Sequence, residues 1–152
     1  MATIETRLLF KLEMRITGVE TVGITPRGPR IISYVNGVFD GPELKGAVVS
    51  GTDHILLRPN DMVAELDARL TLRSDRDEFF YVRYSGFTDI PSEAREAAAA
   101  GIFPPGKFKP RVAVRIETGS SQHARLNRIQ AIGIGQADTV AGTVDYMIYA
   151  IE

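Results

Sequence analysis

The sequence predicts an all-β protein: an antiparallel β-barrel of about eight to nine strands with one short helix, lipocalin-like in general shape. Polar and apolar residues alternate with period two along most of the 152 residues, as they do in half-buried strands. Short turns rich in Gly, Pro, Asn and Asp separate these segments. Glycines also interrupt the strands, which is typical of the bent wall of a barrel. Because closure removes exposed strand edges, we expect a single barrel domain over residues 1–152.

The first half of the chain contains the clearest strands. Alternation predicts them at residues 7–16, 30–35, 54–58 and 62–73. Asn36-Gly37 predicts a tight turn after the second of them. Residues 38–50 also resemble a strand, but Gly41-Pro42 and Gly46 interrupt it and indicate a bulge or a close backbone approach.

The second half adds the remaining strands and the helix. Strands are predicted at residues 78–85, 111–118, 129–135 and 139–151. The one predicted helix covers residues 92–100, with Ser92 as its N-cap and Gly101 as its C-terminal stop. It is short and rich in alanine, so we expect it to lie over a barrel mouth or a sheet edge. The aromatic, proline-rich loop at residues 103–110 is typical of a lid or an interface.

The last predicted strand, residues 139–151, is largely apolar on both faces. Tyr146 and Ile148 face one side, and Met147 and Tyr149 face the other. A strand that is apolar on both faces is covered on both. We therefore expect a second surface against it, and hence a homodimer or higher homo-oligomer.

Composition excludes several classes of function. The net charge is −1, with 18 basic and 19 acidic residues, so the chain lacks the basic footprint of a nucleic-acid-binding protein. Because it has no cysteine, disulfides, thiol catalysis and iron–sulfur clusters are excluded. The charged N-terminal segment is unlike a signal peptide, and no apolar run has the length of a membrane span. We expect a soluble, cytoplasmic protein with no nucleic-acid or membrane partner.

The motifs of metal and cofactor sites are also missing. The two histidines, His54 and His123, match no metal-ligand spacing. Gly133-x-Gly135 lacks the strand–turn–helix setting of a dinucleotide-binding loop. No Gly-x-Ser-x-Gly elbow supplies the nucleophile of a catalytic triad. We therefore expect neither a metal nor a cofactor.

Asp67 and Arg69 are the most informative polar residues. They stand two positions apart on the predicted strand 62–73, so they share a face. If that face lines the barrel, the charges must be paired; Arg69 then suits binding of a carboxylate or enolate, and Asp67 suits a base or an orienting group. If it is the outer face, the pair is solvated while the intervening apolar residues pack the core. Alternation alone leaves both interpretations open.

Other candidates carry similar alternatives. Asp53 and His54 stand at a strand start, where either suits a general acid or base, or where Asp53 bonds turn amides and His54 packs on the surface. Tyr81 and Arg83 suit an anionic aromatic or keto acid if they point inward. If they point outward, they form a cross-strand aromatic pair beside a surface arginine. Tyr34, on the strand at residues 30–35, is a further candidate ligand-binding residue.

Glycine and charged motifs recur along nearly the whole chain. They are Gly37-x-Phe39-x-Gly41-Pro42-x-Leu44-x-Gly46, Gly51-x-Asp53, Leu66-Asp67-Ala68-Arg69, Arg115 with Glu117-Thr118-Gly119, Leu126-Asn127, Gly133-x-Gly135 and Val144-x-Tyr146-x-Ile148-Tyr149. This pattern resembles the bacterial and fungal family known as domain of unknown function 3237. The resemblance implies a β-barrel, but no established activity. Arg115 and Asn127 belong to these motifs and are candidate ligand-binding residues. Asn127 precedes a predicted strand and suits binding of a ligand carbonyl, with a turn or cap as the alternative. His54 and Arg125 stand where that family tends to have Trp and an aromatic residue.

Three kinds of function fit these residues. The first is a cofactor-free acid–base enzyme, such as an isomerase, cyclase or lyase, acting on a keto/enol or carboxylate substrate. Its predicted catalytic residues are Asp53, Asp67 and Arg69, and its ligand-binding residues are Tyr34, His54, Tyr81, Arg83, Arg115 and Asn127. The second is a barrel that binds a small molecule without catalysis. The third is a structural or interaction module with a filled barrel.

Overall fold

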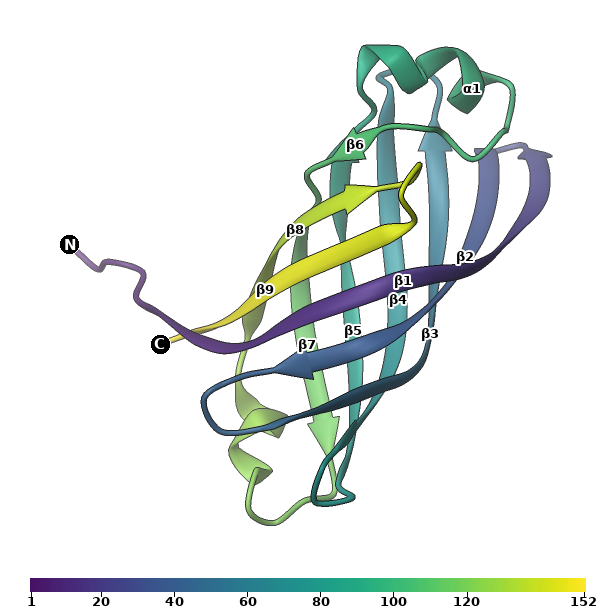
Figure 1. Cartoon of the computed structure of the whole chain (residues 1–152). Helices are drawn as coiled ribbons and strands as arrows, with labels where there is room; N and C mark the ends of the chain where they lie inside the picture. Colours follow the sequence, from purple (N-terminus) through teal and green to yellow (C-terminus); the bar gives the residue numbers. More distant parts are fainter.

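Nine β-strands make up most of the chain in a computed structural model that describes residues 1–152 (Figure 1). They are β1 (Thr6–Thr25), β2 (Gly28–Asp40), β3 (Lys45–Arg58), β4 (Val63–Ser74), β5 (Phe79–Asp89), β6 (Lys107–Phe108), β7 (Arg111–Thr118), β8 (Ala131–Asp138) and β9 (Thr143–Ile151). Three short helical segments join them: η1 (Ser92–Ala94), α1 (Arg95–Ala99) and η2 (Ala124–Arg128). None of these has the length and apolar character that a membrane-spanning helix requires.

Eight of the nine strands close into a barrel. The hydrogen-bonded order is β8-β7-β5-β4-β3-β2-β1-β9, and β9 pairs in turn with β8. Every pairing is antiparallel, and the two-residue β6 adds a further pairing to β8. The predicted antiparallel barrel is therefore confirmed, and the closing pair of strands is the one that the sequence indicated. A barrel of this size has room for side chains or one small ligand.

The first two strands differ from the prediction. β1 runs to Thr25 instead of ending near residue 16, and β2 is continuous through Asn36-Gly37. The turn predicted there is wrong. A side chain at Gly37 would lie 2.0 Å from the carbonyl oxygen of Glu13, so this glycine permits a close approach of two strands. The chain reverses instead after Asp40, between β2 and β3.

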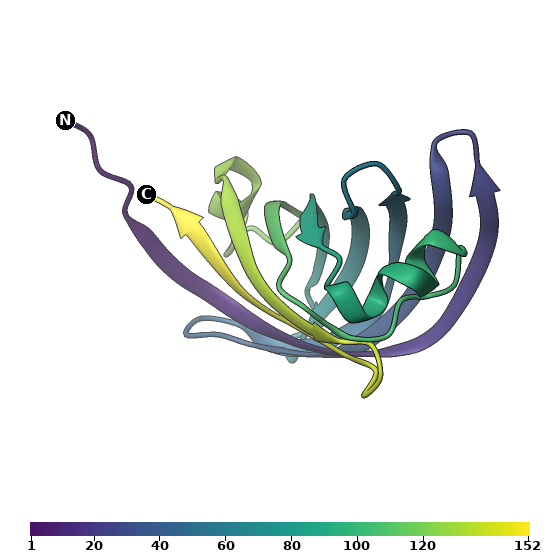
Figure 2. The same cartoon turned by 90° about the horizontal axis from the view of Figure 1, so that it is seen from above.

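The helical segment lies where the sequence placed it, over one end of the barrel (Figures 1 and 2). Its Ala94 and Ala98 are buried, so the alanine-rich face packs onto the strands below. Ser92 does not cap the helix by its side chain, contrary to the prediction. Gly101 does end it, with a φ of 75° that suits glycine.

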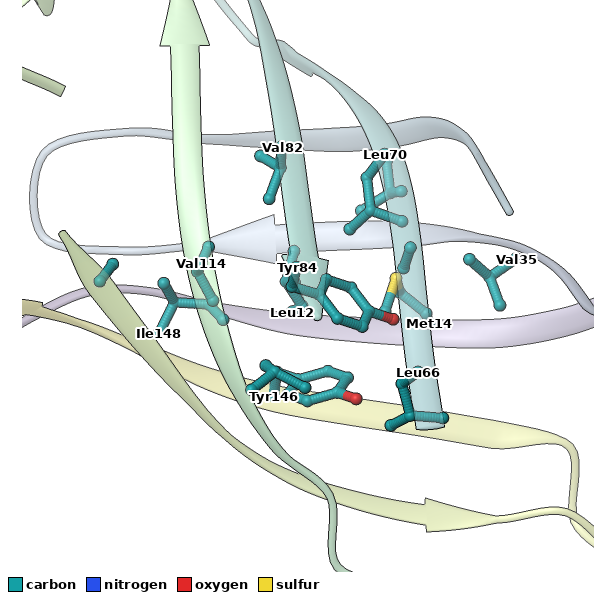
Figure 3. Close-up of a cluster of buried hydrophobic side chains, with 14 of the residues drawn as sticks. Leu12, Met14, Val35, Leu66, Leu70, Val82, Tyr84, Val114, Tyr146 and Ile148 are labelled. Atoms are coloured by element: carbon teal, nitrogen blue, oxygen red, sulfur yellow. The ribbon is translucent and has the colours of Figure 1, made fainter. Parts of the chain in front are cut away.

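Alternation along each strand fills the barrel with apolar side chains. The core cluster contains 29 buried residues, and Figure 3 shows how side chains of facing strands meet inside. On β4, the inward residues are Ala64, Leu66, Ala68, Leu70 and Leu72, each at most 8% exposed. On β9, Tyr146 and Ile148 point inward, whereas Met147, Tyr149 and Ile151 remain partly exposed on the outer wall. Coverage of that outer face by a second copy of the chain stays a prediction.

Candidate functional site

The candidate residues divide between the two faces of the barrel wall. Asp53 is 8% exposed and points inward from β3. The other eight candidates lie outside the core: Tyr34, His54, Asp67, Arg69, Tyr81, Arg83, Arg115 and Asn127. Asp53 is therefore separated from the other eight candidates, which lie outside the barrel core.

A cavity of about 60 Å³ lies inside the barrel near the end that carries α1. Its wall is mostly apolar, and the loop before β7 contributes Phe103, Pro104, Phe108 and Pro110. The polar side chains along it belong to Ser33, Asp53, Thr88, Thr139 and Tyr146. No Lys, Arg or His lines this inner cavity. The aromatic, proline-rich loop thus forms part of the cavity wall, and its role as a lid stays a prediction.

The backbone around Asp53 is opened to accommodate its carboxylate. The ladder between β3 and β4 pairs Asp53 with Ala68, and resumes only at Leu56 with Glu65. In that gap the Asp67 N–H donates a hydrogen bond to Asp53 Oδ1 at 3.2 Å. The side chain of Asp53 thus supplies an acceptor to the neighbouring strand, which holds the carboxylate in place from within the wall.

Burial dominates the electrostatics of Asp53. It raises the pKa of this carboxyl from 3.8 to about 7, against the lowering effect of the hydrogen bond from the Asp67 N–H. The negative charge of Asp67 adds to the increase. A group with a pKa near neutrality exists in both protonation states in a cell, so Asp53 is able to take up or release a proton.

Two tyrosines stand beside Asp53 in the interior. The ring centroids of Tyr84 and Tyr146 are 4.9 Å apart, and their hydroxyls point the same way, toward the side of the barrel where Leu66 lies (Figure 3). Burial raises the pKa of both phenols, and the charge of Asp53 contributes in each case. They therefore stay protonated, so each hydroxyl is able to donate a hydrogen bond.

Neither tyrosine is among the candidates from the sequence. The signal that identifies them is the inward register of β5 and β9: Tyr146 shares a face with Ile148, as the alternation indicated. What the sequence does not show is that the two rings meet across the barrel.

Asp67 and Arg69 lie on the outer wall, so the solvated alternative is the correct one. Their side chains are 58% and 44% exposed, and Arg69 Nη1 donates to Asp67 Oδ1 at 2.9 Å. Tyr81 and Arg83 also point outward, which corrects the interpretation of an interior Tyr–Arg pair. None of these side chains reaches the inner cavity.

Several of the outer candidates lie on one line across the strands. Tyr34, Thr52, Arg69, Arg83 and Arg115 occupy directly opposed positions from β2 to β7. A depression runs along the arginines, bounded on its far side by residues 127–130. We call this feature the outer arginine groove; its central residues are Arg69, Arg83, Arg115 and Gln130.

Two candidates have local structural contacts. His54 Nε2 lies 3.3 Å from Thr52 Oγ1 on the outer face of β3. Asn127 binds the backbone of Thr118 twice: its Oδ1 accepts from the Thr118 N–H at 2.7 Å, and its Nδ2 donates to the Thr118 carbonyl at 3.0 Å. Asn127 thus fixes η2 to the end of β7, as the turn alternative stated.

A second hollow of about 140 Å³ lies at the opposite end of the barrel. It lies between the start of β1, the β2–β3 turn and the η2 region. Arg7, Glu43, His123 and Arg125 are among its lining residues. Its charges are mixed, and no cluster of three or more His, Cys, Asp or Glu side chains in the protein is arranged to hold a metal ion.

Comparison with known proteins gives a family and a fold. Residues 4–151 match the family described as "Protein of unknown function (DUF3237)". A conserved protein of unknown function from Rhodopseudomonas palustris is 25% identical, with all of both chains covered and a TM-score of 0.84. A β-barrel-like protein from Acinetobacter baumannii is 24% identical over 99% of this chain and 98% of that one, with a TM-score of 0.82.

A more divergent structure has been described as an enzyme. It comes from Penicillium herquei, is 19% identical over 99% of this chain and 96% of that one, and has a TM-score of 0.70. No curated protein matches the chain.

Proposed function

The chain belongs to the DUF3237 family, whose description states no function. From the inner cavity, we propose that the protein is a small-molecule-binding barrel in which Asp53 performs acid–base chemistry without a cofactor. The observation that supports this most directly is a carboxyl group inside an apolar cavity with no cation beside it. Burial of an unpaired carboxylate is unfavourable for folding, and strongly shifted pKa values concentrate at functional sites.

The lining of the cavity narrows the class of substrate. Every arginine that was considered as a carboxylate-binding group lies on the outer wall. A negatively charged substrate would meet Asp53 without any basic side chain to neutralise it. The substrate that fits best is therefore uncharged and largely apolar, with a carbonyl group, which favours a keto/enol substrate over a carboxylate.

The chemistry follows from the two kinds of polar group in the cavity. Asp53 in its ionised form removes a proton from the carbon next to the carbonyl. Tyr146, which lines the same cavity, donates a hydrogen bond to the carbonyl oxygen, where negative charge develops. Protonated Asp53 then returns the proton at a different carbon of the conjugated enolate, which gives isomerisation. Alternatively, the enolate carbon adds to a second carbonyl or a conjugated alkene of the same substrate, whose π bond breaks, and Asp53 protonates the resulting anion, which gives cyclisation. No redox step is involved.

Entry to the cavity depends on the loop between α1 and β7. Its short strand β6 pairs with β8 only at Lys107 and Phe108. The Thr139 side chain also holds this loop: its Oγ1 donates to the Pro104 carbonyl at 2.7 Å and accepts from the Gly106 N–H at 2.9 Å. The Thr139 N–H also donates to the Gly106 carbonyl at 3.0 Å, and the Gly135 N–H donates to the Pro110 carbonyl at 2.9 Å. Because the cavity of about 60 Å³ is smaller than a usual small-molecule site, we propose that this loop moves outward to admit the substrate.

A non-catalytic carrier needs the same cavity but no titratable group, so Asp53 favours the enzyme over the carrier. The Penicillium herquei protein that is described as an enzyme shares the fold, which is consistent with catalysis on such a barrel. A purely structural module has no use for the buried acid.

The proposal is tested by proton exchange at carbon. The protein is incubated in D₂O with a panel of neutral cyclic ketones and enones, and deuterium uptake at the α-carbon is followed by NMR. We expect Asp53→Asn to lower the exchange rate by about 10²–10⁴-fold, and Tyr146→Phe by about 10²–10³-fold. Thr71→Ala, on the outer face of β4, is the matched control and should be unchanged. Exchange by Asp53→Asn at the wild-type rate contradicts the role of Asp53.

A further inference from the structure

Two arginines of the outer arginine groove, Arg83 and Arg115, have no ion-pair partner, although the carboxylates of Asp67 and Glu117 also line the groove. Arg69, Arg83 and Arg115 are directly opposite one another on β4, β5 and β7, and neighbouring strands lie about 4.8 Å apart. Arg69 pairs with Asp67 at 2.9 Å, but Arg83 and Arg115 form no ion pair and no side-chain hydrogen bond. Like charges in directly opposed positions destabilise a sheet. Asp67 offsets this repulsion at Arg69, and Glu117, which lines the groove beside Arg115 but forms no ion pair with it, offsets only part of the rest. An anion over Arg83 and Arg115 would therefore stabilise the row.

The far wall of the groove is fixed by hydrogen bonds. Gln130 Nε2 donates to the carbonyls of Val114 and Ala131, each at 3.1 Å. Asn127 is fixed to Thr118, as described above. Because these side-chain amides form hydrogen bonds within the protein, they hold the wall of the groove in place. The guanidinium groups of Arg83 and Arg115 have no such partners and remain available to a ligand.

We propose that the outer arginine groove is a binding site for a small ligand that carries two neighbouring oxyanion groups, a diphosphate or a dicarboxylate, held by Arg83 and Arg115. Each guanidinium presents a planar fork of donors that matches one oxyanion group. Two such forks on adjacent strands match two such groups. The ligand's charge removes the repulsion within the row.

The dimensions of the groove favour a small molecule. It comprises two hollows that share Arg83, Arg115 and Gln130 as lining residues and measure about 570 and 310 Å³, within the range of small-molecule sites. A nucleic acid needs an extended basic surface, whereas this protein has a net charge of −1. The site is separated from the inner cavity by the barrel wall, so it is independent of the chemistry proposed for Asp53.

The experiment uses pyrophosphate and citrate as probes, with affinity measured by isothermal titration calorimetry in 50 mM salt. We expect at least one of them to bind with a Kd in the micromolar range. Arg83→Gln and Arg115→Gln should each weaken binding about tenfold or more, since each removes a charge-assisted bidentate contact. Arg83→Lys keeps the charge without the fork and should give an intermediate Kd.

Two controls separate this site from general attraction to the surface and from the inner cavity. Arg73→Gln removes an exposed arginine from the same face of β4, where Asp77 lies 3.9 Å away, and should leave the Kd unchanged. Asp53→Asn should also leave it unchanged.

Stability provides a second measurement. Without ligand, Arg83→Gln and Arg115→Gln should raise the melting temperature by about 1–2 °C, because they relieve repulsion. A hundredfold excess of probe over its Kd should raise the wild-type value by roughly 5–10 °C.

Binding of pyrophosphate alone identifies a diphosphate ligand, and binding of citrate alone identifies a carboxylate ligand; either supports the proposal. Failure of both probes to bind below 1 mM overturns it. So does equal loss of affinity in Arg73→Gln and Arg83→Gln, since that result indicates attraction by the surface as a whole.

Discussion

The inner cavity and the outer arginine groove hold charged groups under opposite conditions. Asp53 is buried, has no cation beside it, and has a pKa raised to about 7. On the other side of the same wall, Asp67 is largely exposed and paired with Arg69. A single hydrogen bond, from the Asp67 N–H to Asp53 Oδ1, joins the two regions through the sheet. The comparison shows that the chemistry of a carboxylate in this barrel is set by the face of the strand from which it projects.

The largest expected effect on stability comes from a substitution on the inner face of β4, compared with one at the neighbouring residue on its outer face. Leu70 is 1% exposed inside the barrel, and Thr71 follows it on the outer face. Leu70→Ala should reduce the free energy of unfolding by about 2–5 kcal/mol, because it leaves a cavity in the core. Thr71→Ala should change it by less than about 0.5 kcal/mol. Urea unfolding followed by circular dichroism measures both. Similar losses from the two variants contradict the assignment of the faces.

The next effect is the pH dependence that Asp53 produces. Its pKa rises from 3.8 to about 7 on folding, so the folded protein holds this proton more tightly than the unfolded chain. Its contribution to stability is therefore complete below pH 3.8 and is lost as the pH rises to about 7. At 1.36 kcal/mol per pKa unit, the loss amounts to about 4 kcal/mol in total, of which about 2–3 kcal/mol falls between pH 5 and pH 8.

Asp53→Asn isolates this contribution, because asparagine keeps the acceptor for the Asp67 N–H but does not titrate. The variant should be more stable than the wild type at pH 8, and that advantage should shrink by about 2–3 kcal/mol at pH 5. Urea titrations of both proteins at the two pH values give the difference directly. Parallel pH profiles of wild type and variant are incompatible with a raised pKa.

The smallest effect is expected for the exposed pair on the other side of the wall. Asp67→Ala removes the ion pair with Arg69 but leaves the backbone N–H that Asp53 accepts. Since exposed ion pairs contribute about 0.2–1 kcal/mol, the free energy of unfolding should fall by no more than that. A double-mutant cycle with Arg69→Ala measures the pair itself. A coupling energy above about 2 kcal/mol indicates that the pair is shielded from solvent after all.

Much of the fold could be predicted because alternation is a local property. On β4, period two placed Leu66, Ala68 and Leu70 on one face before any partner strand was known, and all three are in the core. Gly37 shows the limit of this approach. Asn-Gly is a turn signal in isolation, but here the glycine permits an approach to the Glu13 carbonyl on β1, a contact between segments that are distant in sequence.

The site was harder to predict than the fold for a similar reason. Alternation assigns residues to two faces, but a barrel that binds a ligand also has polar side chains on its inner face, so the pattern alone does not fix which face is inward. Asp67 and Arg69 therefore remained ambiguous. Asp53 was identified as a candidate, but its burial depends on the opened ladder to β4. The contact between Tyr84 and Tyr146 joins β5 to β9 across the barrel, and neither residue's own segment contains any sign of it.

The most direct test of this account is a pH titration of the Asp53 side-chain carboxyl by ¹³C NMR, assigned by comparison with Asp53→Asn. The raised pKa predicts a midpoint near pH 7. It also predicts that the midpoint moves upward when a neutral ketone fills the inner cavity, because the ketone shields the carboxylate further from solvent. A midpoint close to pH 4, unaffected by the ketone, contradicts the claim that Asp53 is a buried acid–base group facing a ligand cavity.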